Sequence, residues 1–198
     1  IISDEVYRGY AFDGLKGISM GCFNEVNDRV IIVESVSKRY SACGARIGAI
    51  ASKNTALIQN ILKLCQARLC VATLEQIGAA ALYELPTSYT ESIKDEYQAR
   101  RDIVYSTLQN IPGVVCEKPT GAFYVVVKLP VANAEEFVIW LLEEFELDGE
   151  TIMLAPAEGF YATKGLGIDE VRIAYVLNTS DMERAMYILK KGLEKYNN

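Results

Sequence analysis

The first part of the chain contains short apolar runs, which predict strands, followed by a stripe of apolar positions at helical spacing. Residues 30–33 form a short, fully apolar, mostly β-branched run, which is typical of a strand buried on both faces. Residues 1–4 and 47–51 are predicted to be two further short strands, and the loop 35–44 follows the first run. From Thr55 onward a helical stripe is formed by apolar residues at helical spacing, namely Ile58, Ile61, Leu62, Cys65 and Leu69.

The second part of the chain alternates helices with strands. Helices are predicted over 73–85, where Pro86 ends the pattern, and over 90–109. Turn residues then separate strands at 114–116, 123–128 and 171–176. Asn133 with Glu136 is a capping pair for a helix that ends at residue 145, and Ser180 with Glu183 is predicted to cap the last helix.

These patterns predict an α/β fold class in two parts. The first part is similar to a piece of a mostly parallel sheet, and the second is similar to a compact α+β domain. Because Pro86 interrupts the helical pattern, we place the boundary close to it and predict domains at 1–88 and 89–198.

Composition excludes several classes of function. The net charge of -6 argues against nucleic acid as a partner, because phosphate binding needs a basic face. No run is apolar for long enough to span a bilayer, so we expect no membrane partner. Five cysteines without metal-ligand spacing predict reduced thiols, a cytoplasmic location and no metal site. The chain has no histidine, so lysine, carboxylate or tyrosine must move any protons.

The run 30–33 leads into a polar segment that contains Lys38. Most lysines are solvated surface charges, but a lysine after a buried strand can be desolvated, which frees its amine to attack a carbonyl. Ser35 and Ser37 supply hydroxyl groups, and Arg46 supplies a planar fork that suits a phosphate. Residues 35–38 also fit the S-x-x-K of penicillin-binding serine hydrolases, whose companion motifs S-D-N and K-T-G do not occur in this chain.

A second polar cluster follows the opening strand. Asp4 at the carboxyl end of a strand is suited to keep a ring nitrogen protonated, and Tyr7 is suited to donate to a phenolic oxygen. The alternative interpretation is an ordinary polar loop after a strand.

In combination these residues carry a family resemblance. Asp4-x-x-Tyr7, Ser35-x-Ser37-Lys38 and Arg46, in this order, resemble the fold type I aminotransferases, the pyridoxal-phosphate (PLP) family that includes aspartate aminotransferase. The segments 119–124 and 171–175 resemble two small-domain strands of that family, the later one bearing Arg172. The resemblance covers nearly the whole chain. It implies that 1–88 is the C-terminal half of the three-layered PLP-binding large domain and that 89–198 is the small domain.

The resemblance also implies a role for each matching residue. Lys38 would form the Schiff base with the aldehyde of PLP and shuttle a proton. Asp4 would pair with the pyridinium nitrogen and Tyr7 with the phenolic oxygen. The phosphate would be held by Ser35, Ser37 and Arg46. Arg172 would grip the α-carboxylate of the substrate through two parallel hydrogen bonds.

The function that the resemblance implies is amino-group exchange between an L-amino acid and a 2-oxo acid, with aspartate and 2-oxoglutarate as the leading pair. A C–S lyase of the same fold and a non-catalytic dimerisation or packing module remain alternatives. A homodimer active in amino-acid metabolism is expected.

The chain begins without methionine inside a predicted strand, so we expect a fragment. The first half of the family's fold supplies a glycine-containing helix N-terminus for the phosphate, an aromatic residue that stacks on the ring and an asparagine. Because a helix N-terminus is a strong anion site, we expect the fragment alone to be inactive.

Overall fold

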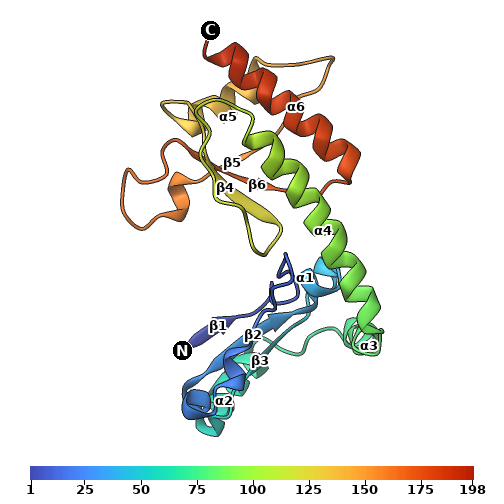
Figure 1. Cartoon of the computed structure of the whole chain (residues 1–198). Coiled ribbons are helices and arrows are strands. Elements are labelled where there is room, and N and C mark those ends of the chain that lie inside the picture. Colours follow the sequence, from blue (N-terminus) through green and yellow to red (C-terminus); the bar gives the residue numbers. More distant parts are fainter. The chain divides into compact units, whose positions relative to one another are not determined.

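The computed structural model describes residues 1–198 and divides into two compact units, Ile1–Asp95 and Glu96–Asn198 (Figure 1). The predicted boundary at 88/89 lies before the geometric division, which falls inside the long helix α4 (Thr87–Leu108).

The first unit contains three strands, three α-helices and the start of α4. Its elements in chain order are β1 (Ile2–Asp4), β2 (Ile31–Ser35), α1 (Val36–Arg39), β3 (Gly48–Ala51), α2 (Thr55–Ala67) and α3 (Thr73–Leu82). Short 3-10 turns lie at Met20–Cys22, Asn24–Arg29 and Cys43–Ala45.

The three strands of this unit form one sheet in the order β1-β2-β3. β1 runs parallel to β2, with Asp4 opposite Val33, whereas β3 runs antiparallel to β2, with Gly48 opposite Ser35. The predicted strands are therefore present, but β2 is only partly buried along its length and not buried on both faces as its apolar run predicted. The loop predicted after β2 is wrong in part, because residues 36–39 form the single helical turn α1.

Helices α2 and α3 bury little of their apolar surface within this unit. α2 has no buried residue although its apolar residues follow the predicted stripe, and α3 buries only Ala79. Large apolar side chains stay exposed along both helices and the segment that joins them. We call this set the α2–α3 surface; it consists of Leu62, Leu64, Leu69, Val71, Leu74 and Ile77.

The second unit is an α+β arrangement. It contains the end of α4, then β4 (Tyr124–Lys128), α5 (Ala134–Glu143), β5 (Ala155–Pro156), β6 (Glu170–Ala174) and α6 (Thr179–Tyr196), with a 3-10 turn at Glu158–Phe160. The strands form an antiparallel sheet in the order β4-β6-β5, and Figure 1 shows the helices of this unit gathered beside it.

The core of the second unit lies between this sheet and its helices. Along β4 and β6 exposure alternates, and the buried face presents Val125 opposite Ile173 and Val127 opposite Val171. Helices contribute apolar side chains that are nearly or fully buried, among them Leu108, Phe137, Leu141, Met186 and Leu189. Arg172 and Tyr124 belong to the other face of the sheet, because side chains alternate along a strand.

Two sequence expectations for this unit need correction. Residues 114–116 were expected as a strand, yet only Val115 makes an isolated bridge, to Lys128. The last helix is capped by Asn178, whose side chain accepts from the Asp181 amide at 2.9 Å, and not by Ser180. Ser180 instead lies inside the first turn and donates to the Asn178 side chain. The expected cap Asn133 is confirmed, since it accepts from the amides of Glu135 and Glu136.

These two units confirm the predicted α/β fold class. None of the helices combines the length and the apolar character that crossing a membrane requires.

Candidate functional site

The candidate residues of the first unit meet at one edge of its sheet. Parallel β1 and β2 end at the same edge, which places Asp4, the last residue of β1, beside the end of β2 at Ser35. Antiparallel β3 begins where β2 ends, so Arg46, two residues before β3, lies at this edge too. The ends of β1 and β2 and the start of β3 therefore bring these polar residues to one edge of the sheet.

Ser35 ends β2 and begins α1. Its hydroxyl caps the helix by accepting from the Ser37 amide at 3.1 Å, as N-cap serines commonly do. The same oxygen lies 2.8 Å from the Ser37 hydroxyl and 2.9 Å from the Ile47 carbonyl. The two serine hydroxyls thus share one hydrogen-bonded cluster between α1 and the entrance to β3.

Lys38 lies in α1, directly behind this serine pair. Val36 and Tyr40, one helical turn apart, are buried against Ala79 of α3 and so anchor the turn. The Tyr40 ring also meets the Tyr83 ring edge-on, with centroids 5.4 Å apart. Because α1 is packed through Val36 and Tyr40, Lys38 between them is partly exposed on the remaining face.

Arg46 is exposed and has a left-handed backbone, with φ of 55°. Its guanidinium donates to the carbonyl of Cys43 at 3.0 Å and makes no ion pair with any carboxylate. This conformation is uncommon for a side chain other than glycine, asparagine or aspartate. Arg46 directly precedes Ile47, whose carbonyl lies 2.9 Å from the Ser35 hydroxyl. An exposed arginine at this position, with its charge uncompensated by a carboxylate, is suited to bind an anion.

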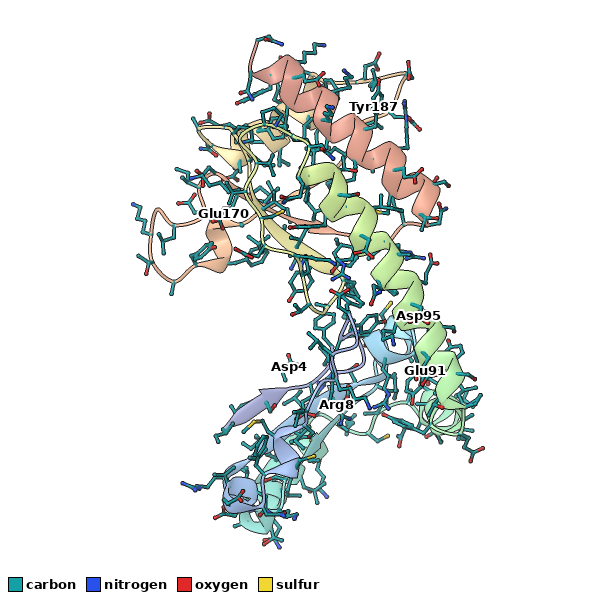
Figure 2. All side chains as sticks on the ribbon, viewed as in Figure 1. Asp4, Arg8, Glu91, Asp95, Glu170 and Tyr187 are labelled. Atoms are coloured by element: carbon teal, nitrogen blue, oxygen red, sulfur yellow. The ribbon has the colours of Figure 1, made fainter.

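Asp4 and Tyr7 occupy the turn after β1. Asp4, labelled in Figure 2, is exposed, and its Oδ1 accepts from the Val6 amide at 3.2 Å. Tyr7 is partly buried and meets the ring of Tyr10 edge-on, with centroids 6.2 Å apart. The predicted pair therefore lies on one turn at the same sheet edge as Ser35.

A buried carboxylate, which the sequence analysis did not single out, holds this turn. Glu5 is only 6% exposed, and its Oε1 accepts from the Ser19 hydroxyl at 2.9 Å and the Met20 amide at 3.0 Å. Its Oε2 forms an ion pair with Arg8 at 3.3 Å, although without hydrogen-bond alignment. Glu5 is thus a structural carboxylate next to Asp4, and only the tertiary fold reveals it.

Arg172 belongs to the second unit and lies on β6. It makes no ion pair with a carboxylate. Its guanidinium instead lies over two aromatic rings, 4.9 Å from the centroid of Phe160 and 5.6 Å from that of Tyr124. Cation–π contacts hold the guanidinium without using its hydrogen-bond donors.

Sequence reasoning did not single out Phe160, which comes from the loop before β6. The loop is attached by Tyr161, whose hydroxyl donates to Glu170 at 2.5 Å and whose pKa is raised chiefly by that hydrogen bond. Asp169, at the end of the loop, pairs with Lys128 at 2.6 Å. The only sequence signal was the aromatic pair Phe160-Tyr161 shortly before a strand that carries an arginine.

Known proteins similar to this chain are aminotransferases. The family described as "Aminotransferase class I and II" matches residues 1–189. Aspartate aminotransferase of Bacillus subtilis is 30% identical over 99% of this chain and 49% of that protein. Aspartate aminotransferase of Geobacillus stearothermophilus is 31% identical, over 98% of this chain and 49% of that protein.

Solved structures agree with this assignment. An alanine aminotransferase of Pyrococcus furiosus superposes with a TM-score of 0.83 at 29% identity, over 98% of this chain and 49% of that one. An aspartate aminotransferase of Rhodobacter sphaeroides, 22% identical, shares the fold with a TM-score of 0.87 over 100% of this chain and 49% of its own. The chain thus spans about half the length of the curated relatives it matches. On the strength of a family match along most of its length, this chain belongs to the class I and II aminotransferases.

Proposed function

We propose that this chain is the lysine-bearing part of a PLP-dependent aminotransferase and that the whole protein exchanges an amino group between an L-amino acid and a 2-oxo acid. The observation that carries the proposal is the gathering of Asp4, Ser35, Lys38 and Arg46 at one sheet edge, with the Arg46 guanidinium lacking any carboxylate partner.

These side chains fit PLP in their chemistry. Its phosphate needs hydroxyl and guanidinium donors, which Ser35, Ser37 and Arg46 supply. Its ring nitrogen needs a carboxylate, and the exposed carboxylate of Asp4 is not engaged in an ion pair. These side chains thus offer donors for the phosphate and an acceptor for the protonated ring nitrogen.

When bound, PLP supplies an electron sink for the carbanion that forms at the substrate Cα. The residues of this chain would perform the remaining tasks. Ser35, Ser37 and Arg46 would hold the phosphate, while Asp4 would keep the ring nitrogen protonated. The Tyr7 hydroxyl would donate to the phenolic oxygen. The Lys38 amine would move the proton from the substrate Cα to the cofactor carbon, since the chain has no histidine for this task.

Arg172 would bind the substrate α-carboxylate. Its guanidinium rests on the Phe160 and Tyr124 rings and keeps its N–H donors for a ligand. A guanidinium fork matches a carboxylate through two parallel hydrogen bonds, which the single ammonium of lysine does not reproduce. This contact would be common to all amino-acid substrates and so would not select among them.

Aspartate with 2-oxoglutarate is the leading substrate pair, supported by relatives named aspartate aminotransferase. Others are named for aromatic amino acids or alanine, so the experiment is a panel of amino donors. Purified whole protein with PLP is incubated with each amino acid and 2-oxoglutarate, and glutamate is measured. We expect aspartate to give the highest kcat/KM, with oxaloacetate and glutamate formed in equal amounts.

The panel also separates the alternatives. Sulfide and pyruvate released from cysteine, without glutamate, would identify a C–S lyase. No product with any donor, together with no PLP binding, would identify a non-catalytic packing module. Loss of glutamate formation in Lys38→Ala, with an unchanged melting temperature, is the result expected of the proposed role.

We further propose a cytoplasmic homodimer in which residues 1–88 belong to the PLP-binding large domain and 89–198 form the small domain. The α2–α3 surface supports a protein partner, because exposed apolar patches on soluble proteins mark interaction sites. Free, mostly exposed cysteines are compatible with a reducing compartment.

A further inference from the structure

The helix that carries Lys38 is too short to be stable without contacts to the rest of the protein. α1 spans Val36–Arg39, and a single helical turn is unfavourable in isolation because nucleation costs more than one hydrogen bond returns. At its N-terminal end the Ser35 side chain accepts from the Ser37 amide, and on its buried face Val36 and Tyr40 pack against the core. The carbonyl groups at its C-terminal end need separate partners.

One of these carbonyl groups belongs to Lys38 itself. It accepts from the hydroxyl of Tyr10 at 2.5 Å, a shorter contact than the one from the Ser41 amide at 3.4 Å. The Tyr40 amide also donates to it as the helix ends. Tyr10 is therefore a side-chain partner that closes the C-terminal end of the Lys38 turn.

Tyr10 is well placed to act as a fixed point. Its side chain is only 3% exposed, and its amide donates to the Tyr7 carbonyl at 2.8 Å. Its ring meets the Tyr7 ring edge-on. The same residue thus contacts both the turn that carries Asp4 and Tyr7 and the helix that carries Lys38.

We propose that Tyr10 is a positioning residue that fixes the backbone of Lys38 relative to Asp4 and Tyr7. It acts by holding the Lys38 carbonyl, which sets the point from which the Lys38 side chain leaves the backbone. This inference rests on the proposed PLP function, because the benefit of fixing Lys38 against Asp4 and Tyr7 is a preorganised cofactor site.

The test is Tyr10→Phe in the whole protein, with Tyr83→Phe as the matched control. Both variants lose one phenol oxygen near α1, but the Tyr83 hydroxyl makes no hydrogen bond while its ring contacts Tyr40. Hydrogen exchange is measured without PLP at the Tyr40 and Ser41 amides, which donate to the same carbonyl. The loss of one hydrogen bond changes a local opening equilibrium by roughly two- to tenfold. We therefore expect these two amides to exchange faster by that factor in Tyr10→Phe and at the wild-type rate in Tyr83→Phe.

PLP titration then separates positioning from mere structure. In Tyr10→Phe we expect the dissociation constant for PLP to rise by roughly two- to tenfold and the pH midpoint of the bound cofactor's visible absorbance to shift. Unchanged exchange in α1 would overturn the proposal. Faster exchange with unchanged PLP affinity and midpoint would overturn it as well, since Tyr10 would then be structural only. A wild-type protein in which PLP does not attach to Lys38 refutes the proposed function instead, whatever Tyr10 does.

Discussion

At the scale of single residues, the charge partners of the arginines distinguish structure from candidate function. Arg184 forms ion pairs with Asp148 at 2.9 Å and Glu150 at 2.7 Å. Arg46 and Arg172 have no such partners and are held by a carbonyl and by aromatic rings respectively. Because an uncompensated guanidinium keeps its donors for a ligand, we expect substitution of Arg172 to affect catalysis more than stability.

Arg172→Lys keeps the positive charge but loses the planar fork. Hydrogen bonds to charged groups contribute about 1.5–3 kcal/mol each, so we expect kcat/KM to fall roughly ten- to a hundredfold for every amino donor. Steady-state kinetics of the whole protein measures this. Arg184→Lys is the control and should leave kcat/KM unchanged. Equal kinetics for Arg172→Lys and wild type would remove Arg172 from substrate binding.

Cys116 differs from the other four thiols in its burial. It is partly buried, whereas the other four are exposed, and desolvation raises the pKa of its thiol above the ordinary value. Since the thiolate is the reactive form, we expect iodoacetamide at pH 8 to modify Cys116 last, as followed by peptide mass spectrometry. Because burial disfavours the thiolate, the fold keeps its full stability below the pKa of Cys116 in the unfolded chain and loses stability as the pH rises through the higher folded-state pKa. Modification of Cys116 as fast as of Cys22 would contradict this.

At the scale of elements, helix ends decide the details that the hydrophobic pattern leaves open. Ser180 and Glu183 have the spacing of a capping box, yet the cap is Asn178, two residues earlier. Asn178 and Ser180 both precede the same apolar stripe, so the hydrophobic pattern alone does not show which of the two caps the helix.

The alanine variants at these two positions test the assignment of the cap. Asn178→Ala should lower the free energy of unfolding by about 1 kcal/mol, because the Asp181 amide loses its acceptor. Ser180→Ala should cost clearly less, since its hydroxyl only donates to Asn178. Urea denaturation of both variants measures the difference. A larger loss in Ser180→Ala would restore the original prediction.

The features that could be predicted from the sequence are those formed by residues close together along the chain. The strand before Ser35 and the helical stripe of α2 are local patterns, and both were found. α1 was missed because four residues do not establish a helical period. The Tyr10 contact to Lys38 and the Phe160 contact to Arg172 join residues 28 and 12 positions apart, and no local pattern encodes them.

At the scale of the whole molecule, the exposed apolar side chains of the α2–α3 surface support the proposed interface with another protein chain. Leu74 of the α2–α3 surface is 81% exposed, and Ile77, one turn on, is 64% exposed. Such side chains on one helix face are more typical of an interface than of a solvated surface. The proposed homodimer would cover them.

Leu74→Glu tests this role in the whole protein. A buried charge without a partner is costly, so we expect the dimer to dissociate or weaken, as measured by light scattering after size-exclusion chromatography. Leu166→Glu, a change at an exposed leucine of the second unit, serves as the control and should leave the mass unchanged. A Leu74→Glu dimer as tight as wild type would exclude this surface from the interface.

The central claim is that the amine of Lys38 is the attachment point of PLP. The most direct measurement is to incubate the whole protein with PLP, reduce with borohydride and map the modified peptide by mass spectrometry. We expect one modified lysine, Lys38, and no label in Lys38→Ala. A label on another lysine, or no label in the wild-type protein, would contradict the assignment.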